Sequence, residues 1–129
     1  MTGLVPNETV ARYMATADVF ALPSLLEALP TVAVEALACG TPVISADHPG
    51  GVELREMFGD DVRIVPREGV EPLALALTEF FERPRRTQPE TATRIGVWFR
   101  PASVLRAFDR VYSAARTLTA PSQSTSERV

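Results

Sequence analysis

Short apolar runs alternate with longer stretches of helical periodicity along most of the chain. The runs Val19–Leu22, Pro42–Ala46 and Val62–Val65 have the length of buried strands, and the third is the weakest of them. Strands separated by helices are typical of crossover units in a parallel sheet. The pattern therefore predicts an α/β fold with about three parallel strands and flanking helices.

Helical spacing fills the intervals between these runs. Asn7 is expected to cap a helix that ends near Thr16, and Thr31 to cap one that ends near Cys39, with Gly40 as the left-handed residue after it. Asp47–Gly51 is expected to be a turn. Three further helices are predicted: Val52–Phe58, Glu71–Arg83 and Ala102–Leu118. The polar segment 84–94 is expected to be irregular, and the Ser- and Thr-rich tail 119–129 disordered.

Three strands make a thin parallel sheet. Such sheets are covered on both faces, and the first strand would leave an apolar edge without a neighbour. We therefore predict that residues 1–118 form the second half of a doubly wound, Rossmann-like domain.

Composition narrows the class of protein. The 129 residues are 46% hydrophobic and 22% charged, with a net charge of −3 and no lysine among the 13 basic residues. This acidic balance argues against nucleic acid as a partner. No segment has the apolar length of a transmembrane helix, and the single Cys39 is expected to be a small buried residue in a reducing, cytoplasmic compartment.

Glu35 is the formal charge that stands out in the centre of the chain. It is the only charged residue between Ala28 and Ala46, within a helix that is otherwise small or apolar. A carboxylate buried there would need hydrogen-bond donors. It either faces solvent or accepts from the diol of a bound sugar, while the free amides of Thr31 and Val32 at the helix start would suit a phosphate.

Glu27 lies in the loop after the first strand, at the carboxyl end of the sheet, where open α/β folds bind ligands. A loop glutamate is usually solvated, so its pairing with Glu35, with seven residues between the two, is the informative feature. Nearby, His48 is expected to be an exposed turn residue, although it could touch a substrate. Gly50 and Gly51 either offer amides to a ligand or supply a turn with positive φ.

The segment from Glu27 through Glu35 to Ile44 resembles the signature of retaining GT-B glycosyltransferases of the glycosyltransferase 4 family. The flanking segments Ala17–Ser24 and Gly50–Leu54 are also typical of that family, in the same order, and the resemblance spans Gly3–Phe81. It departs from the family pattern at Ala28 and Pro30, where glycine is frequent.

The resemblance implies specific roles. Glu27 would contact the donor sugar and act as the catalytic residue by stabilising positive charge at the anomeric centre. Glu35 would bind the ribose hydroxyls, and backbone amides of Leu29, Thr31 and Val32 would approach the sugar and diphosphate. The expected ligand is a nucleotide-sugar such as a UDP- or GDP-sugar, with no metal and no other cofactor.

Family members have a second domain that binds the acceptor, and basic residues that neutralise the diphosphate. No arginine lies between Arg12 and Arg55, so catalysis by this chain alone is not expected. Three interpretations stay open: a piece of a glycosyltransferase, a nucleotide-sugar-binding domain that pairs with a separate N-terminal half, or an α/β interaction module. The full-length family would be cytoplasmic, with some members peripheral to the membrane.

Overall fold

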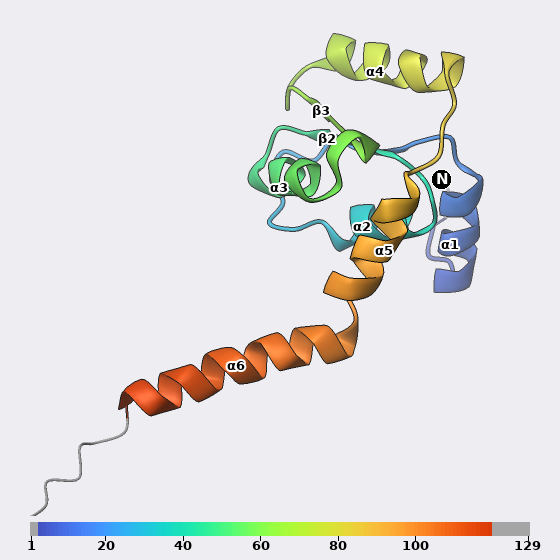
Figure 1. Cartoon of the computed structure of the whole chain (residues 1–129). Coiled ribbons are helices and arrows are strands. Elements are labelled where there is room, and N and C mark those ends of the chain that lie inside the picture. Colours follow the sequence, from blue (N-terminus) through green and yellow to red (C-terminus); the bar gives the residue numbers. More distant parts are fainter. Residues whose placement is uncertain (1–2, 120–129) are drawn as a thin grey trace, which may run out of the picture. The chain divides into compact units, whose positions relative to one another are not determined.

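The computed structural model describes residues 3–119, which divide at Ile95 into two compact units. The first unit contains the strands and most of the helices, and the second contains the long helix near the C-terminus (Figure 1). The predicted tail lies outside the described residues, except that Thr119 is the last residue of that helix.

Three parallel strands, β1 (Phe20–Leu22), β2 (Val43–Ala46) and β3 (Val62–Val65), form a sheet in the order β1-β2-β3. Phe20 pairs with Val43, which pairs in turn with Val62, so all three strands start at one edge of the sheet and end at the other. The predicted α/β fold is confirmed. Within the described residues β1 pairs only with β2, which leaves its other side open as expected.

Helices cover both faces of this sheet. The connections from β1 to β2 and from β2 to β3 pass through α2 (Thr31–Ala38) and α3 (Pro49–Phe58). Because parallel crossovers are right-handed and the strand order is sequential, both helices lie on one face. The opposite face carries α4 (Val70–Glu82) (Figure 1).

The apolar core under α4 is built from alternate strand residues. Ile44 and Val65 pack against Ala76 and Phe80, while Val19, Leu73 and Leu77 complete the cluster. The other face buries Leu37 of α2 and Leu54 of α3 completely. Nearly continuous burial of β2 explains why its sequence is an unbroken apolar run rather than an alternating one.

Several predicted boundaries change. Pro6 and Pro30, not Asn7 and Thr31, occupy the cap positions of α1 (Asn7–Thr16) and α2, and neither helix has a side-chain cap bond. Both prolines accept the first backbone bonds through their carbonyl groups, so the following residue already belongs to the helix. The predicted left-handed Gly40 is confirmed, with φ +83°.

The segment that we expected to be irregular is partly helical. It contains α5 (Pro89–Trp98), which follows β3 and α4 and is preceded by an extended stretch rich in arginine. Buried Asp61, in the 3₁₀ turn Gly59–Asp61, accepts from the amide of Gln88 at 2.9 Å and from the hydroxyl of Thr91 at 2.6 Å. A tertiary contact therefore caps this helix, which the local sequence did not reveal.

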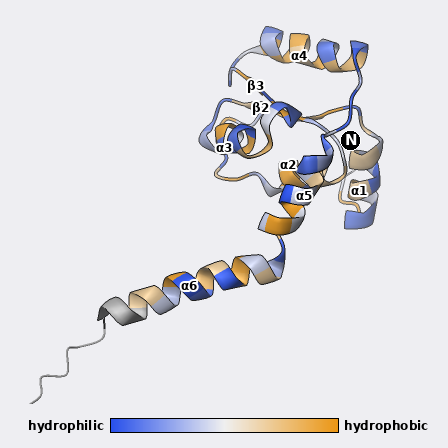
Figure 2. Cartoon of the chain, in the orientation of Figure 1, coloured by the Kyte–Doolittle hydropathy of each residue, from blue (hydrophilic) through white to orange (hydrophobic). Residues whose placement is uncertain are grey.

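The second unit is mainly α6 (Pro101–Thr119), as the helical spacing predicts. Apolar and polar residues alternate along it with helical periodicity (Figure 2). The rings of Phe108 and Tyr112, one turn apart, stack with centroids 6.3 Å apart. Both side chains are more than half exposed, so α6 presents an apolar stripe.

Candidate functional site

The carboxyl edge of the sheet gathers three connecting segments. Residues 23–30 follow β1, Asp47 and His48 follow β2, and residues 66–69 follow β3. Because the strands are parallel, the three segments leave the same edge. The predicted loop with Glu27 is therefore placed where α/β folds bind ligands.

A close backbone contact fixes the Glu27 loop against the start of α3. The amide of Gly50 donates to the carbonyl oxygen of Glu27 at 3.1 Å. A Cβ atom at position 50 would lie 2.0 Å from the carbonyl oxygen of Ala28, which no side chain tolerates. Gly50 thus permits the helix and the loop to touch, and it positions Glu27.

Gly51 has an equivalent role one residue later. A Cβ atom there would lie 2.3 Å from the carbonyl oxygen of Ala46 and 2.6 Å from the hydroxyl of Ser45. Neither Gly50 nor Gly51 has positive φ, and both are buried within the first turn of α3. The expectation of a turn at these positions is wrong, because α3 begins three residues before the predicted Val52.

His48 is fully buried, so the expectation of an exposed turn residue is wrong. Its Nδ1 accepts from the amide of Gly51 at 3.0 Å and so caps α3. Its Nε2 lies 3.4 Å from the hydroxyl oxygen of Ser45. Since Nδ1 accepts, the ring proton is on Nε2 and points to Ser45. Both ring nitrogens of His48 therefore contact groups of the protein itself, and the side chain stabilises the fold beneath the carboxyl edge.

The helix α2 buries one side and exposes the other. Ala33, Val34, Ala36 and Leu37 are buried, whereas Thr31, Glu35 and Ala38 form an exposed stripe at spacings of four and three residues. Of the two alternatives for Glu35, the structure shows the solvent-facing one. The four apolar residues face the sheet and helix α1, and the helical period turns residue 35 outward.

The start of α2 has unused backbone donors. Its first backbone bonds run from Ala33 at 3.0 Å and Val34 at 3.4 Å to the carbonyl oxygen of Pro30. The amides of Thr31 and Val32 precede these bonds and have no partner inside the helix. Thr31 thus combines a free amide with a place on the same exposed stripe as Glu35. Leu29, the third predicted amide donor, is half-buried just ahead of Pro30.

Glu35 borders a pocket of about 340 Å³ between α1 and α2. Half-buried Cys39, which we expected to be fully buried, also lines it, with Asn7, Val10, Ala11, Met14 and Ala38. Glu27 is half-buried and does not line this pocket. Within residues 3–119, neither glutamate side chain has a hydrogen bond or an ion pair. Both carboxylates are therefore available to a ligand.

Arg67 is a cation at this edge that the sequence analysis did not predict. Arg67 follows the end of β3, and its Nε lies 3.1 Å from a carboxylate oxygen of Asp47, which also accepts from the Arg67 amide. The two residues line a pocket of about 500 Å³ with Leu25 and Glu68. The signal was its position: the first residues after a parallel strand always lie at the carboxyl edge.

A parallel sheet covered on both faces, with ligand-accessible connections at its carboxyl edge, is a Rossmann-like α/β unit. The sequence pattern of the family described as glycosyl transferases group 1 matches residues 1–96. The chain belongs to this family, and the recognised likeness to the C-terminal portion of a glycosyltransferase 4 enzyme is confirmed.

Individual relatives agree with this assignment. The chain is 41% identical over 93 residues to TuaC of Bacillus subtilis (strain 168), whose name assigns it provisionally as a glycosyltransferase of teichuronic acid biosynthesis. That match covers 71% of this chain and 23% of TuaC. The chain is also 34% identical over 118 residues to the D-inositol 3-phosphate glycosyltransferase of Corynebacterium aurimucosum, covering 90% of this chain and 28% of that enzyme.

The fold has a solved counterpart in sucrose-phosphate synthase from Thermosynechococcus elongatus. The TM-score is 0.74 at 27% identity, over 92% of this chain and 30% of that structure. The chain thus spans about a quarter of the length of the curated relatives named here. Among the described residues, no helix is long and apolar enough to cross a membrane.

Proposed function

We propose that this chain supplies the nucleotide-sugar-binding part of a glycosyltransferase that retains the configuration of the transferred sugar. In that reaction the bond from the anomeric carbon to the diphosphate breaks, and the nucleoside diphosphate leaves with the electron pair. The anomeric carbon then bonds to an acceptor oxygen, which loses its proton.

The single observation that carries the proposal is the exposed stripe of α2. It aligns the free amide at Thr31 with the unpaired carboxylate of Glu35, about one helical turn apart. Phosphate groups suit the amide end of a helix, where the unpaired N–H groups and the dipole both favour negative charge. A carboxylate one turn further along is placed to accept hydrogen bonds from the two ribose hydroxyls.

Glu27 takes the sugar side of the ligand in this proposal. Its loop is anchored through the contact with Gly50, and its side chain has no partner within residues 3–119. A carboxylate held near the anomeric carbon would stabilise the positive charge that develops there. The amides of Leu29 and Val32 would bracket the diphosphate, while Pro30 between them cannot donate.

The acceptor site would come from a second domain, and the main diphosphate cations from the other half of the donor domain. The cation that this chain does bring to the carboxyl edge, Arg67, is paired with Asp47. The open side of β1 is placed to pair with another strand of the same sheet. We therefore expect this chain alone to bind a nucleotide without transferring a sugar.

The test is calorimetric titration of the chain with UDP, GDP and ADP. For the nucleotide that binds, Glu35→Gln should weaken binding by about tenfold or more, because a charge-assisted bond to ribose is lost. The matched control is Glu90→Gln, which removes an exposed glutamate at the start of α5.

A deoxyribose analogue sharpens this test. If Glu35 accepts from the ribose diol, Glu35→Gln should have a much smaller effect on binding of the 2′-deoxynucleotide. An equal effect on both nucleotides would remove the ribose role from Glu35. Failure of all three nucleotides to bind at millimolar concentration would overturn the proposal.

A further inference from the structure

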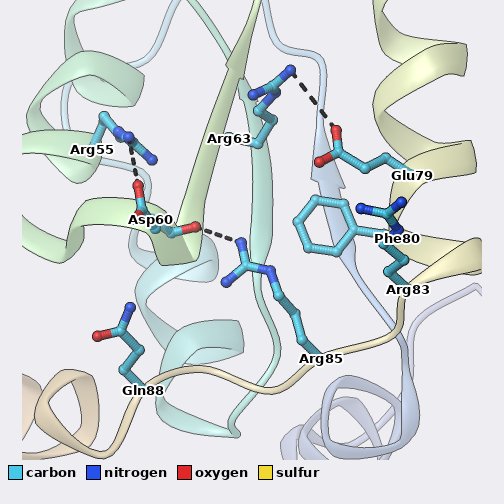
Figure 3. Close-up of a pocket in the computed structure, with 8 residues that line it drawn as sticks. All are labelled: Arg55, Asp60, Arg63, Glu79, Phe80, Arg83, Arg85 and Gln88. Atoms are coloured by element: carbon cyan, nitrogen blue, oxygen red, sulfur yellow. Dashed lines mark hydrogen bonds and ion pairs between the residues drawn. The ribbon is translucent and has the colours of Figure 1, made fainter.

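Another cavity lies at the opposite edge of the sheet, where β3 begins. Its volume is about 450 Å³, and all of its lining residues belong to the first unit (Figure 3). They are Arg55, Asp60, Arg63, Glu79, Phe80, Arg83, Arg85 and Gln88. Four guanidinium groups face two carboxylates in the lining, and buried Asp61 pairs with Arg85 at 3.4 Å, so the local excess is one positive charge in a chain whose net charge is −3.

Two of the four arginines are held by the protein itself. Arg55 donates to the carbonyl oxygens of Gly59 and Val62 at 2.9 Å and pairs with Asp60 at 2.8 Å. Arg85 donates to the carbonyl oxygen of Asp60 at 2.5 Å and lies over the ring of Phe80, with 5.1 Å between the guanidinium carbon and the ring centroid. These contacts make a fixed wall.

The other two arginines have unused donors. Arg63 is 3.8 Å from Glu79, which is too long for a hydrogen bond, and both side chains are more than half exposed. The side chain of Arg83, just after α4, has no hydrogen bond or ion pair to any residue from 3 to 119, and neither does the side-chain amide of Gln88. Figure 3 shows Arg63 and Arg83 near Glu79, with Arg85 and Gln88 on the stretch of chain that continues from Arg83.

We propose that this cavity binds the phosphate group of a small, soluble phosphorylated molecule. A phosphate monoester carries nearly two negative charges at neutral pH, which the guanidinium groups of Arg63 and Arg83 can offset through their unused donors. Its three terminal oxygens can accept from guanidinium groups in several directions, and planar guanidinium groups suit phosphate oxygens through paired donors.

This site is separate from the proposed nucleotide site. Arg63 is the second residue of β3 and Asp60 precedes that strand, so the cavity borders the amino edge of the sheet. Glu27 and Thr31 follow the carboxyl end of β1. The proposal therefore does not depend on the proposed function, and substitutions at one edge should leave binding at the other unchanged.

The test is a titration of the ¹⁵N-labelled chain with inorganic phosphate and with glycerol 3-phosphate, at an ionic strength kept constant with sodium chloride. We expect saturable shifts centred on the amides of residues 83–88. The double substitution Arg63→Gln and Arg83→Gln should weaken binding at least tenfold. Arg12→Gln, which removes an exposed arginine paired with Glu8 on α1, should have no effect.

Glu79→Gln provides an independent check that a purely structural role would not reproduce. It removes the carboxylate that competes for Arg63, so the affinity for phosphate should rise severalfold. Because Glu79 is exposed on α4, this variant tests the proposal even if the double variant fails to fold.

Three results would overturn the proposal. The first is a phosphate response without saturation or identical to that of chloride, and the second is equal affinity in the wild type and the double variant. The third is binding to vesicles containing phosphatidylglycerol without binding to either soluble phosphate, because the ligand would then be a lipid surface.

Discussion

The carboxyl and amino edges of the sheet differ in their packing and in which charged side chains lack partners. At the carboxyl edge, two glycines let α3 touch the connecting segments, and the carboxylates of Glu27 and Glu35 have no partner among residues 3–119. At the amino edge, the buried carboxylate of Asp61 has three partners, one of which is Arg85. The carboxyl edge is held by close backbone packing, and its glutamate carboxylates lack partners. The amino edge is held by ion pairs and hydrogen bonds, and some of its arginines have unused donors.

Gly50→Ala should have the largest effect on stability. The new Cβ atom would overlap the carbonyl group of Ala28, so the Glu27 loop must move away from α3. We expect a loss of about 3 kcal/mol in the free energy of unfolding, measured by urea denaturation. Gly96→Ala, in open space within α5, is the control and should be stabilising by about 0.5 kcal/mol. Equal effects of the two substitutions would show that the close backbone contact at Gly50 does not hold the Glu27 loop in place.

Asp61→Ala should be the next most damaging change, at the amino edge. It removes the acceptor for the Gln88 amide and the Thr91 hydroxyl and the partner of Arg85. We expect a cost of about 2 to 3 kcal/mol, with faster hydrogen exchange at the start of α5. Asp60→Ala, at an exposed position, should cost less than about 1 kcal/mol. A mild effect of Asp61→Ala would contradict the role of charge in ordering this edge.

His48→Ala tests the buried cap beneath the carboxyl edge. The substitution leaves the Gly51 amide without its acceptor and opens a space beside Ser45. Thermal unfolding should report a cost of about 2 kcal/mol, and His48→Asn, which can still cap, should recover about half of it. If asparagine gave no recovery, packing of the ring would outweigh the cap.

Arg63→Gln should have the smallest effect on stability. Its contact with Glu79 is long and exposed, so we expect a change below about 0.5 kcal/mol by urea denaturation. A larger loss would mean that Arg63 belongs to the fixed wall of the amino edge, and the contrast between held and free arginines would disappear.

Features that depend on local sequence were predicted correctly. The apolar runs predicted all three strands, and Gly40 marked the end of α2, because strand burial and left-handed glycine are recorded in local sequence. The placement of Glu27 after β1 also followed from the strand alone. The binding roles of Glu27, Leu29, Thr31, Val32 and Glu35 stay predictions that nucleotide titration will test.

Tertiary structure decided what local patterns could not. The sequence determined the α/β class, the order of the strands and the family, since each depends on neighbouring residues or on an ordered motif. Only the fold showed that His48 is buried, that the backbone of the Glu27 loop lies in close contact with Gly50, and that α2 turns Glu35 outward. These properties depend on atoms from segments distant in the chain, and a residue's type does not reveal which distant segment will cover it.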